Sequence, residues 1–255
     1  MNLTGNTILI TGGGSGIGRG LAEAFHNEGN QVIIAGRSRK TLDEVTSANP
    51  GMKAVELDIE NPKEIKAVAS RIAGEFPTLN VLVNNAGIMR PENLKTRSQD
   101  LIDAEAMVAT NLLGPIRLTA ELLPHLLRQP RATILNVSSG LAFVPLAITP
   151  TYCATKAAIH SYSLSLRWQL KDANTEVIEL IPPYVQTHLM GPQQAVDPRA
   201  MPLNEFLAEV MEILRTKPQV TEVCVEKVKG LRFAAENNAF DNTFQGLNES
   251  MTELH

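Results

Sequence analysis

Short apolar runs alternate along the chain with longer segments in which apolar residues recur at helical spacing. The first run covers residues 7–10 and is followed by a helical pattern that ends at Gly29. Strands that alternate with helices in this way favour a parallel, doubly wound α/β sheet with helices on both faces. The sequence therefore predicts one domain over residues 1–255 with six or seven strands. The other five runs begin at Gln31, Lys53, Val81, Ile134 and Glu176.

Helix boundaries can be predicted at several points from capping residues and prolines. Asn61, Pro62 and Glu64 have the cap, first-turn proline and third-position glutamate of a helix start. We expect that helix to run to about Phe76, because a proline follows at position 77. A longer helical pattern runs from about residue 100 to 127, and the prolines at 115 and 124 predict a bend or an interruption in it.

The last third of the chain has weaker signals. Residues 184–202 lack clear periodicity and follow a strand, which predicts a mobile lid over a substrate pocket, in a segment extending to about residue 215. An irregular connection is the alternative. Helices are expected at 203–214 and 221–236. Residues 237–255 contain no convincing strand, so 237–247 must supply a seventh strand or leave the sheet one strand short.

Composition narrows the classes of function. The net charge of −4 and the pI near 5.8 give no basic surface for nucleic acid. No run of 18 apolar residues occurs, and the chain enters its first strand without a leader, so we expect a cytoplasmic protein with no membrane partner. Two cysteines, Cys153 and Cys224, are too few for a disulfide framework or a zinc site, and the histidines have no metal-ligand spacing.

A glycine-rich turn between the first strand and the first helix predicts a phosphate-binding site. Glycine permits a tight turn and close approach of the backbone, and a helix N-terminus offers free N–H groups to an anion. A flexible turn alone is the alternative, but the position between strand and helix favours binding. The predicted contacts are Gly12, Ser15, Gly16, Ile17 and Gly18.

The residues after the second strand bear on the choice of nucleotide. In a dinucleotide-binding fold an acidic residue at this point binds the ribose 2′-hydroxyl, whereas an arginine suits a 2′-phosphate. Arg37 follows Gly36 here, with Arg39 and Lys40 close by. The alternative is a solvated, charged helix start. The sequence therefore favours NADP(H), and NAD(H) stays open.

Three residues near the centre of the chain have the chemistry to hold and protonate a carbonyl oxygen. Ser139 follows an apolar strand, and Tyr152 and Lys156 are four residues apart, which places them on one face of a helix. A positive charge beside a phenol favours the phenolate. An ordinary amphipathic helix would explain the pair Tyr152 and Lys156 by itself, but not the combination with Ser139 and the glycine turn.

Taken together and in order, these motifs resemble the short-chain dehydrogenase/reductase family over roughly residues 4–190. The interval of thirteen residues between Ser139 and Tyr152 is the most specific feature. The stretches 137–145 and 182–187 further resemble the branch named for an oxidoreductase associated with D-alanylation of lipoteichoic acid. The resemblance implies a Rossmann-type fold and hydride transfer to or from a nicotinamide cofactor.

The resemblance also implies roles for individual residues. Tyr152 would be the general acid in reduction and the base in oxidation, and Lys156 would lower its pKa and bind the nicotinamide ribose. Ser139 would hydrogen-bond the substrate oxygen, and Asn111 would hold a water in the proton path.

Further cofactor contacts follow from the resemblance as well. Asp58 would contact adenine and Thr187 the carboxamide, but Pro183 stands where most members have glycine, which makes the contact at Thr187 less certain. The residues expected to line the cofactor after the fourth strand are Asn85, Ala86 and Gly87.

The predicted substrate pocket is largely apolar, which favours a hydrophobic ketone or secondary alcohol. Its walls would include Leu141, Phe143, Tyr184 and Leu189. A regulator that binds cofactor without turnover and a partner protein of a cell-envelope pathway are the alternative functions.

The helix that carries Tyr152 has two apolar faces. Ile159, Leu166 and Leu170 share the side of Tyr152, whereas Leu164 and Trp168 lie roughly opposite. A second apolar face needs a covering surface, so we expect a homodimer or homotetramer that buries Trp168.

Overall fold

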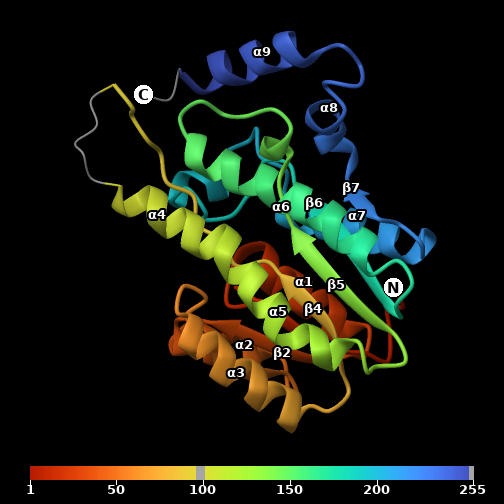
Figure 1. Cartoon of the computed structure of the whole chain (residues 1–255). Coiled ribbons are helices and arrows are strands. Elements are labelled where there is room, and N and C mark those ends of the chain that lie inside the picture. The colour runs from red at the N-terminus through yellow and green to blue at the C-terminus, as the bar shows by residue number, and fades with distance from the viewer. Residues whose placement is uncertain (96–100, 253–255) are drawn as a thin grey trace.

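Seven parallel strands form a single sheet in the computed structural model, which describes residues 1–95 and 101–252 (Figure 1). The strand order is β3-β2-β1-β4-β5-β6-β7, so the chain reverses direction across the sheet between β1 and β4. This confirms the predicted fold class and settles the strand number at seven. The strands are β1 (Thr7–Thr11), β2 (Gln31–Gly36), β3 (Lys53–Glu56), β4 (Leu79–Asn84), β5 (Ala132–Val137), β6 (Thr175–Ile181) and β7 (Glu222–Cys224).

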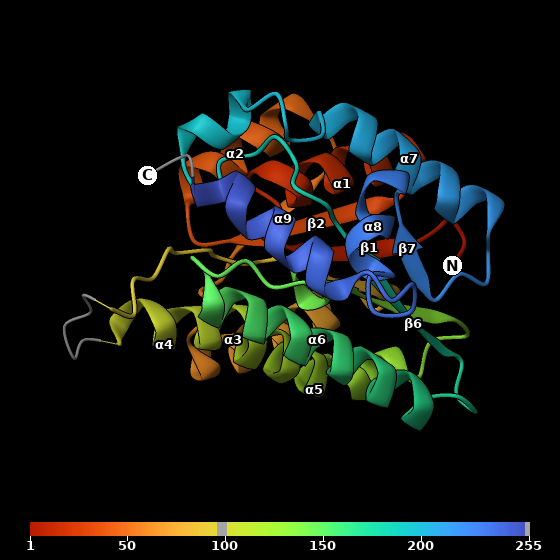
Figure 2. The ribbon, with the colours of Figure 1, turned by 90° about the horizontal axis from the view of Figure 1, so that it is seen from above.

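Helices cover both faces of the sheet, as Figure 2 shows, with α1, α2 and α7 on one face and α3, α5 and α6 on the other. The alternation of side chains along each strand explains the two layers. Ile8 and Ile10 of β1 pack in the cluster that includes α1 and α7, whereas Leu9 packs in the cluster of α3 and α5. The helices are α1 (Gly16–Asn27), α2 (Arg39–Ala48), α3 (Pro62–Glu75), α4 (Ile102–Val108), α5 (Gly114–Leu126), α6 (Pro150–Gln169), α7 (Leu203–Thr216), α8 (Lys229–Arg232) and α9 (Phe240–Thr252).

Two predicted helix features are confirmed. The side chain of Asn61 accepts hydrogen bonds from the backbone N–H groups of Lys63 and Glu64 at the start of α3. The long helical pattern is interrupted near Pro115, because a π-helical turn over Ala109–Leu113 separates α4 from α5 and Pro115 lies in the first turn of α5. Pro124 does not interrupt the pattern, since α5 continues past it to Leu126. The expected helix start near residue 100 lies outside the described residues.

The prediction of a helix over residues 221–236 is wrong. Val223 is fully buried in β7, which pairs with β6, and α8 begins only at Lys229. The β-branched run around Val223 and Val225 therefore takes its structure from pairing with a buried neighbour strand, which no local helical pattern reveals. The segment 237–247, expected either to form this strand or to leave the sheet short of one, belongs largely to α9.

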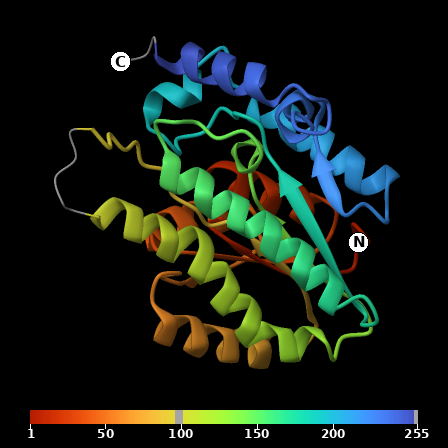
Figure 3. The same ribbon diagram turned by 45° about the horizontal axis from the view of Figure 1, so that its top comes forward.

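The C-terminal helix α9 lies across the carboxyl end of the sheet, as Figures 1 and 3 show. Asn248 anchors it there, since its Oδ1 accepts a hydrogen bond from Ala147 N at 2.6 Å and its Nδ2 donates to Pro145 O at 3.2 Å. Leu247 packs against the cluster that contains Tyr152. The helix thus covers the loop between β5 and α6.

The expected lid segment divides into two parts. Residues 203–215 belong to α7, whose Phe206 and Val210 are fully buried in the core. Residues 184–202 run outside the helices apart from a short 3₁₀ turn, and a bridge between Val185 and Met201 ties the ends of the segment together.

Helix α6 has the two faces that its sequence predicts. Ile159, Leu166 and Leu170 are buried, whereas the side chain of Trp168 is 73% exposed and Leu164 is also exposed. Among the described residues, no helix is both long enough and apolar enough to cross a membrane.

Candidate active site

The glycine-rich turn lies at the carboxyl ends of β1 and β4, where the strand order reverses. Gly12 and Gly16 have φ values of +67° and +53°, which favour glycine. The Thr11 hydroxyl accepts hydrogen bonds from Asn85 N and Ala86 N, both at 3.0 Å, and Asn85 Nδ2 donates to Thr11 O at 2.8 Å. The turns after the two strands therefore hold each other in place.

At Gly18, in the first turn of α1, the packing leaves no room for a side chain. A Cβ atom on Gly18 would lie 2.3 Å from both Asn85 Nδ2 and Gly12 O. Ser15, which precedes α1, makes no side-chain hydrogen bond to the first turn of the helix. The Ser15 side chain thus leaves the first N–H groups of α1 uncapped beside the cavity. Uncapped N–H groups at a helix start suit the phosphates of a dinucleotide.

Two adjoining cavities of about 350 and 300 Å³ extend from this turn in opposite directions. One contains Ser139, Tyr152 and Lys156, and the other contains Arg37. Both are lined by Gly12, Ser15, Ala86, Gly87 and Ile88. Together they form a cleft across the reversal point of the sheet, which is where open α/β sheets bind ligands.

A larger surface hollow of about 650 Å³ lies elsewhere, between β3 and the helices α2 and α3. It is lined by residues such as Arg39, Arg71 and Glu75 and by none of the predicted site residues. Its size alone does not make it the site, because convergent polar groups mark a catalytic pocket better than volume does.

Helix α6 brings two of the predicted catalytic side chains together. Lys156 Nζ lies 5.6 Å from the centroid of the Tyr152 ring and donates a hydrogen bond to Val137 O at 2.9 Å. The Ser139 hydroxyl accepts a hydrogen bond from Leu141 N at 3.1 Å. All three residues are at least nine-tenths buried at the cavity wall, so charges on them are poorly screened by water.

Burial dominates the ionisation of this pair. It raises the pKa of the Tyr152 phenol above its ordinary value, against the opposite effect of a hydrogen bond with Ser139. It also lowers the pKa of Lys156 to about 8, against the opposite effect of Glu179. The resemblance implied a lowered tyrosine pKa, but for the protein chain alone desolvation of the phenolate outweighs the hydrogen bond with Ser139 and raises the pKa. The phenol is therefore set up as a proton donor.

Asn111 lies in the π-helical turn and connects two walls of the cavity. Its Oδ1 accepts a hydrogen bond from Ile88 N at 2.8 Å, and its Nδ2 donates to Ile88 O at 2.8 Å and to Thr155 Oγ1 at 3.2 Å. Thr155 in turn donates to Tyr152 O at 2.7 Å. These bonds hold the amide of Asn111 between Ile88 and the start of α6.

Gln194 is a site residue that the sequence did not reveal. Its Nε2 donates to Val185 O at 2.7 Å and to Thr187 Oγ1 at 3.1 Å, and its Oε1 accepts from Met190 N at 2.9 Å. It therefore holds Thr187, the expected carboxamide contact, at the cavity wall beside Pro183. A lone glutamine in an aperiodic segment carries no signal that could have identified it.

An apolar cavity of about 90 Å³ adjoins Ser139 and Tyr152. Leu141, Tyr184 and Leu189 line it as predicted, and so do two residues that sequence reasoning missed, Leu231 of α8 and Leu247 of α9.

Phe143 does not line this cavity. Its ring makes an edge contact with His160 at 4.7 Å between centroids, and the Arg232 guanidinium lies 4.5 Å from its centroid. Arg90, which was not predicted as a site residue, lines the cavity of about 350 Å³ that contains Tyr152 and Lys156.

At the other end of the cleft, Arg37 is 60% exposed and its Nη1 lies 3.4 Å from Glu60 Oε1. Asp58 does not line the cavity, because its carboxylate turns back to accept a hydrogen bond from Glu60 N at 3.0 Å. Leu57 and Ile59 line the cavity on either side of it.

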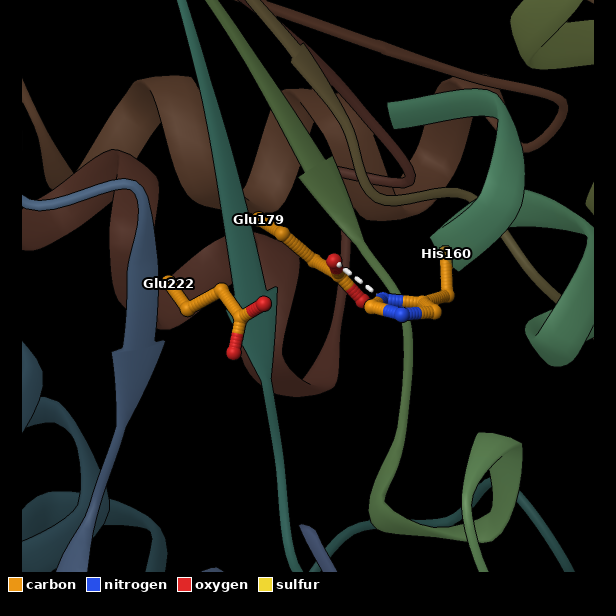
Figure 4. A group of neighbouring side chains, drawn as sticks. All are labelled: His160, Glu179 and Glu222. Atoms are coloured by element: carbon orange, nitrogen blue, oxygen red, sulfur yellow. Dashed lines mark hydrogen bonds and ion pairs between the residues drawn. The ribbon is translucent and has the colours of Figure 1, made fainter. Parts of the chain in front are cut away.

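One group of side chains outside the cleft has the composition of a metal site. Ligand atoms of His160, Glu179 and Glu222 all lie within 4.8 Å of one another (Figure 4). Arg232 already binds Glu222 through Nε at 2.7 Å and Nη2 at 3.1 Å.

The packing at Gly18 yields a test of the cleft. In Gly18→Ala, the added methyl group must push Asn85 and the backbone of Gly12 apart. Overpacking costs about 1–3 kcal/mol, so we expect NADPH to bind about fivefold to 150-fold more weakly. Fluorescence titration measures the affinity. Gly74→Ala in α3, where a Cβ meets nothing within 4 Å, is the control. Unchanged affinity in Gly18→Ala would contradict binding at this turn.

Comparison with known proteins agrees with this geometry. Residues 6–197 match the family model described as short chain dehydrogenase. The chain is 41% identical over 251 residues to the uncharacterized oxidoreductase DltE of Bacillus subtilis (strain 168), covering 97% of this chain and 98% of that protein, which confirms the predicted branch. It is similar in structure to a short chain dehydrogenase from Burkholderia cenocepacia J2315 in complex with NADP (TM-score 0.80, 25% identity, 96% of this chain and 99% of that one). It is also similar to a 3-ketoacyl-(acyl-carrier-protein) reductase from Brucella melitensis complexed with NADH (TM-score 0.78, 27% identity, 89% of this chain and 100% of that one). The chain is an oxidoreductase that belongs to the short-chain dehydrogenase family.

Proposed function

We propose that the protein interconverts a carbonyl compound and a secondary alcohol with NADP(H), with Tyr152 as the general acid and base. The observation that carries this proposal is the position of Ser139, Tyr152 and Lys156 in the cavity that opens from the glycine-rich turn. A dinucleotide on that turn would extend along the cleft toward these side chains, and the close packing at Gly18 supports a built phosphate site.

The bound nicotinamide supplies the hydride, and the side chains of this chain do the remaining work. The Ser139 hydroxyl donates a hydrogen bond to the carbonyl oxygen, and the Tyr152 phenol gives that oxygen its proton. The Lys156 ammonium stabilises the phenolate that is left, so the developing negative charge is never without a partner. In oxidation of the alcohol, the phenolate takes the proton back.

The substrate class of this proposal is a ketone with an apolar substituent. The cavity of about 90 Å³ beside Ser139 and Tyr152 is lined mainly by aliphatic side chains and prolines, which supports a small hydrocarbon group next to the reacting carbon. Residues 184–202 act as the substrate lid, and Gln194 connects lid movement to Thr187.

The preference for NADP(H) rests on Arg37. Its exposed guanidinium lies at the edge of the cavity beyond β2, where two of its N–H groups can donate to a 2′-phosphate. Glu60 competes for the same guanidinium, so the phosphate must displace a weak ion pair. Similar proteins were crystallised with NADP and with NADH, and NAD(H) is therefore the alternative cofactor.

A regulator that binds the cofactor without turnover and a partner of a cell-envelope pathway are the rival functions. The complete set of Ser139, Tyr152 and Lys156 favours catalysis, because binding alone does not need a buried proton donor beside an ammonium. The proposal keeps the cytoplasmic location predicted from the sequence.

The reaction is tested with Tyr152→Phe, which removes the phenol and keeps the ring. We expect NADPH oxidation with a panel of apolar ketones to fall about 100- to 10,000-fold, the usual contribution of a general acid, while NADPH still binds. Tyr162→Phe on the same helix is the control and should stay active. A wild type that binds NADPH but reduces no ketone, and that captures a pathway protein instead, would favour the rival functions.

The cofactor preference is tested with Arg37→Asp. An aspartate repels the 2′-phosphate and accepts a hydrogen bond from a 2′-hydroxyl, so kcat/KM with NADPH should fall about tenfold to a hundredfold and that with NADH should rise. Initial rates with both cofactors give the ratio, and Arg71→Asp on α3 controls for the change in net charge. Equal losses with both cofactors would argue against a role for Arg37 in choosing between them.

The exposed face of α6 supports a homodimer or homotetramer. Trp168 and Leu164 form an uncovered apolar strip on a helix whose other face is buried in its own core. Wild type should therefore sediment as an oligomer at micromolar concentration, and Trp168→Glu should shift it toward the monomer. Gln169→Glu, which adds the same charge at the next position, should leave the oligomer intact. Sedimentation of wild type as a monomer would refute this part of the proposal.

A further inference from the structure

A row of polar side chains crosses the sheet below the active site, on the face covered by α5 and α6. Asn84, Asn136, Glu179 and Glu222 occupy matching positions on β4, β5, β6 and β7. Asn84 Nδ2 donates to Asn136 Oδ1 at 2.8 Å, and Asn136 Nδ2 donates to Ser163 Oγ of α6 at 2.9 Å. The two asparagines thus bind each other and α6, although Asn84 Oδ1 has no hydrogen-bond partner among the described residues, whereas the two glutamates bring negative charge into the same row.

Glu179 is the unusual member of this row. It is 0% exposed, and a buried carboxylate is unfavourable unless it is paired and hydrogen-bonded. His160 Nδ1 lies 2.8 Å from Glu179 Oε2 (Figure 4), whereas Glu179 Oε1 has no hydrogen-bond partner within residues 1–95 and 101–252. The edge contact with Phe143 holds the imidazole against the carboxylate, which accounts for the position of that ring away from the substrate.

The positive charge that lies against Glu222 is the guanidinium of Arg232, and two glutamates share it. Arg232 binds both oxygens of Glu222 and also Glu236 Oε1 at 2.7 Å. Its charge is therefore not available to balance Glu179 in full. The charged and titratable groups that face Glu179 from the elements around it are Lys156 and His160 of α6, Glu222 and Cys224 of β7, and Arg232 of α8.

The fold brings Lys156 within electrostatic reach of this carboxylate. It precedes His160 by one turn of α6, and its Nζ binds the carbonyl of Val137. Val137 directly follows Asn136, which is in register with Glu179. Burial lowers the pKa of Lys156, and the negative charge of Glu179 raises it again. Buried ammonium and buried carboxylate thus compensate for each other through the low-dielectric interior.

We propose that Glu179, oriented by His160, is a positioning residue that keeps the ammonium of Lys156 charged beside Tyr152. The inference rests on the proposed role of Lys156 as the cationic partner of the phenolate. Glu179 touches neither substrate nor cofactor, and it acts on the reaction only through the charge of Lys156. The hydrogen bond between His160 and one carboxylate oxygen fixes the orientation of the Glu179 side chain.

A metal ion is the competing explanation of the same side chains. A cation between His160, Glu179 and Glu222 would lie beside the Arg232 guanidinium, which repels it and already occupies both oxygens of Glu222. The structure therefore favours a network of hydrogen bonds and ion pairs over a metal site.

The test measures the pKa of Lys156 in cofactor-free protein by NMR of isotope-labelled lysine, with the signal assigned by its loss in Lys156→Met. Glu179→Gln removes the charge and keeps the shape of the side chain. We expect the pKa of Lys156 to fall by about one unit, a tenfold drop in the ratio of ammonium to amine at a given pH. The alkaline limb of the kcat/KM profile should move to lower pH by a similar amount, because activity is lost once Lys156 loses its proton.

Glu222→Gln is the matched control, since it makes the same chemical change one strand away at a residue whose charge Arg232 balances. It should shift the pKa of Lys156 much less. His160→Leu, at a partly exposed position, should lower that pKa in the same direction as Glu179→Gln, and it decides the question if Glu179→Gln does not fold by circular dichroism.

Two results would overturn the proposal. One is an unchanged pKa of Lys156 in a folded Glu179→Gln or, failing that, in His160→Leu. The other is stoichiometric binding of Zn²⁺ or Mn²⁺ that raises the melting temperature of wild type and not of the variants, which would make the group a metal site. Because the NMR titration needs no turnover, a wild type inactive on ketones would refute the proposed reaction while leaving the coupling of Glu179 to Lys156 measurable.

Discussion

The hydrogen bond from Lys156 Nζ to the carbonyl of Val137 fixes a positive charge at the buried floor of the cleft, and the other features of the site are arranged around it. This bond forms only if α6 has one position along the direction of β5. The same position also places Tyr152, which lies one helical turn before Lys156. Asn111 and Thr155 hold the opposite wall to the same stretch of α6. The base of the site is therefore built from helix and strand rather than from loops, which favours accurate positioning of reacting groups.

Much of this arrangement could be predicted from the sequence because the signals are local. The glycine turn, the cap at Asn61 and the spacing of Tyr152 and Lys156 each follow from backbone rules that operate over a few residues. Order along the chain then brings them together, since carboxyl ends of parallel strands meet at one edge. Features that depend on distant pairing escaped prediction. Val223 is in a strand only because β6 lies beside it, and Phe143 turns to His160 because Arg232 and Glu179 approach from elsewhere in the chain.

The substrate end of the cleft shows the same limit. Leu231 and Leu247 reach it from α8 and α9, far along the chain from Tyr152, and Gln194 is held by hydrogen bonds to residues on either side of a turn. Nothing in the spacing of these residues marks them. The cofactor end follows a general plan that sequence motifs describe, whereas the substrate end depends on packing between segments that have no motif. The reaction class can therefore be read from this chain more readily than the substrate.

The polar row on β4 to β7 has a consequence for how the sheet assembles. Strands rich in valine, isoleucine and leucine can pair in several alignments of similar apolar burial. A slip of β6 by one residue would turn the Glu179 carboxylate toward the apolar layer under α1 and α7, away from His160, and would separate it from Asn136 and Glu222. A buried charge stranded in that layer is far more costly than a misplaced leucine. The same carboxylate that sits behind the active site thus discriminates against misaligned sheets while the chain folds.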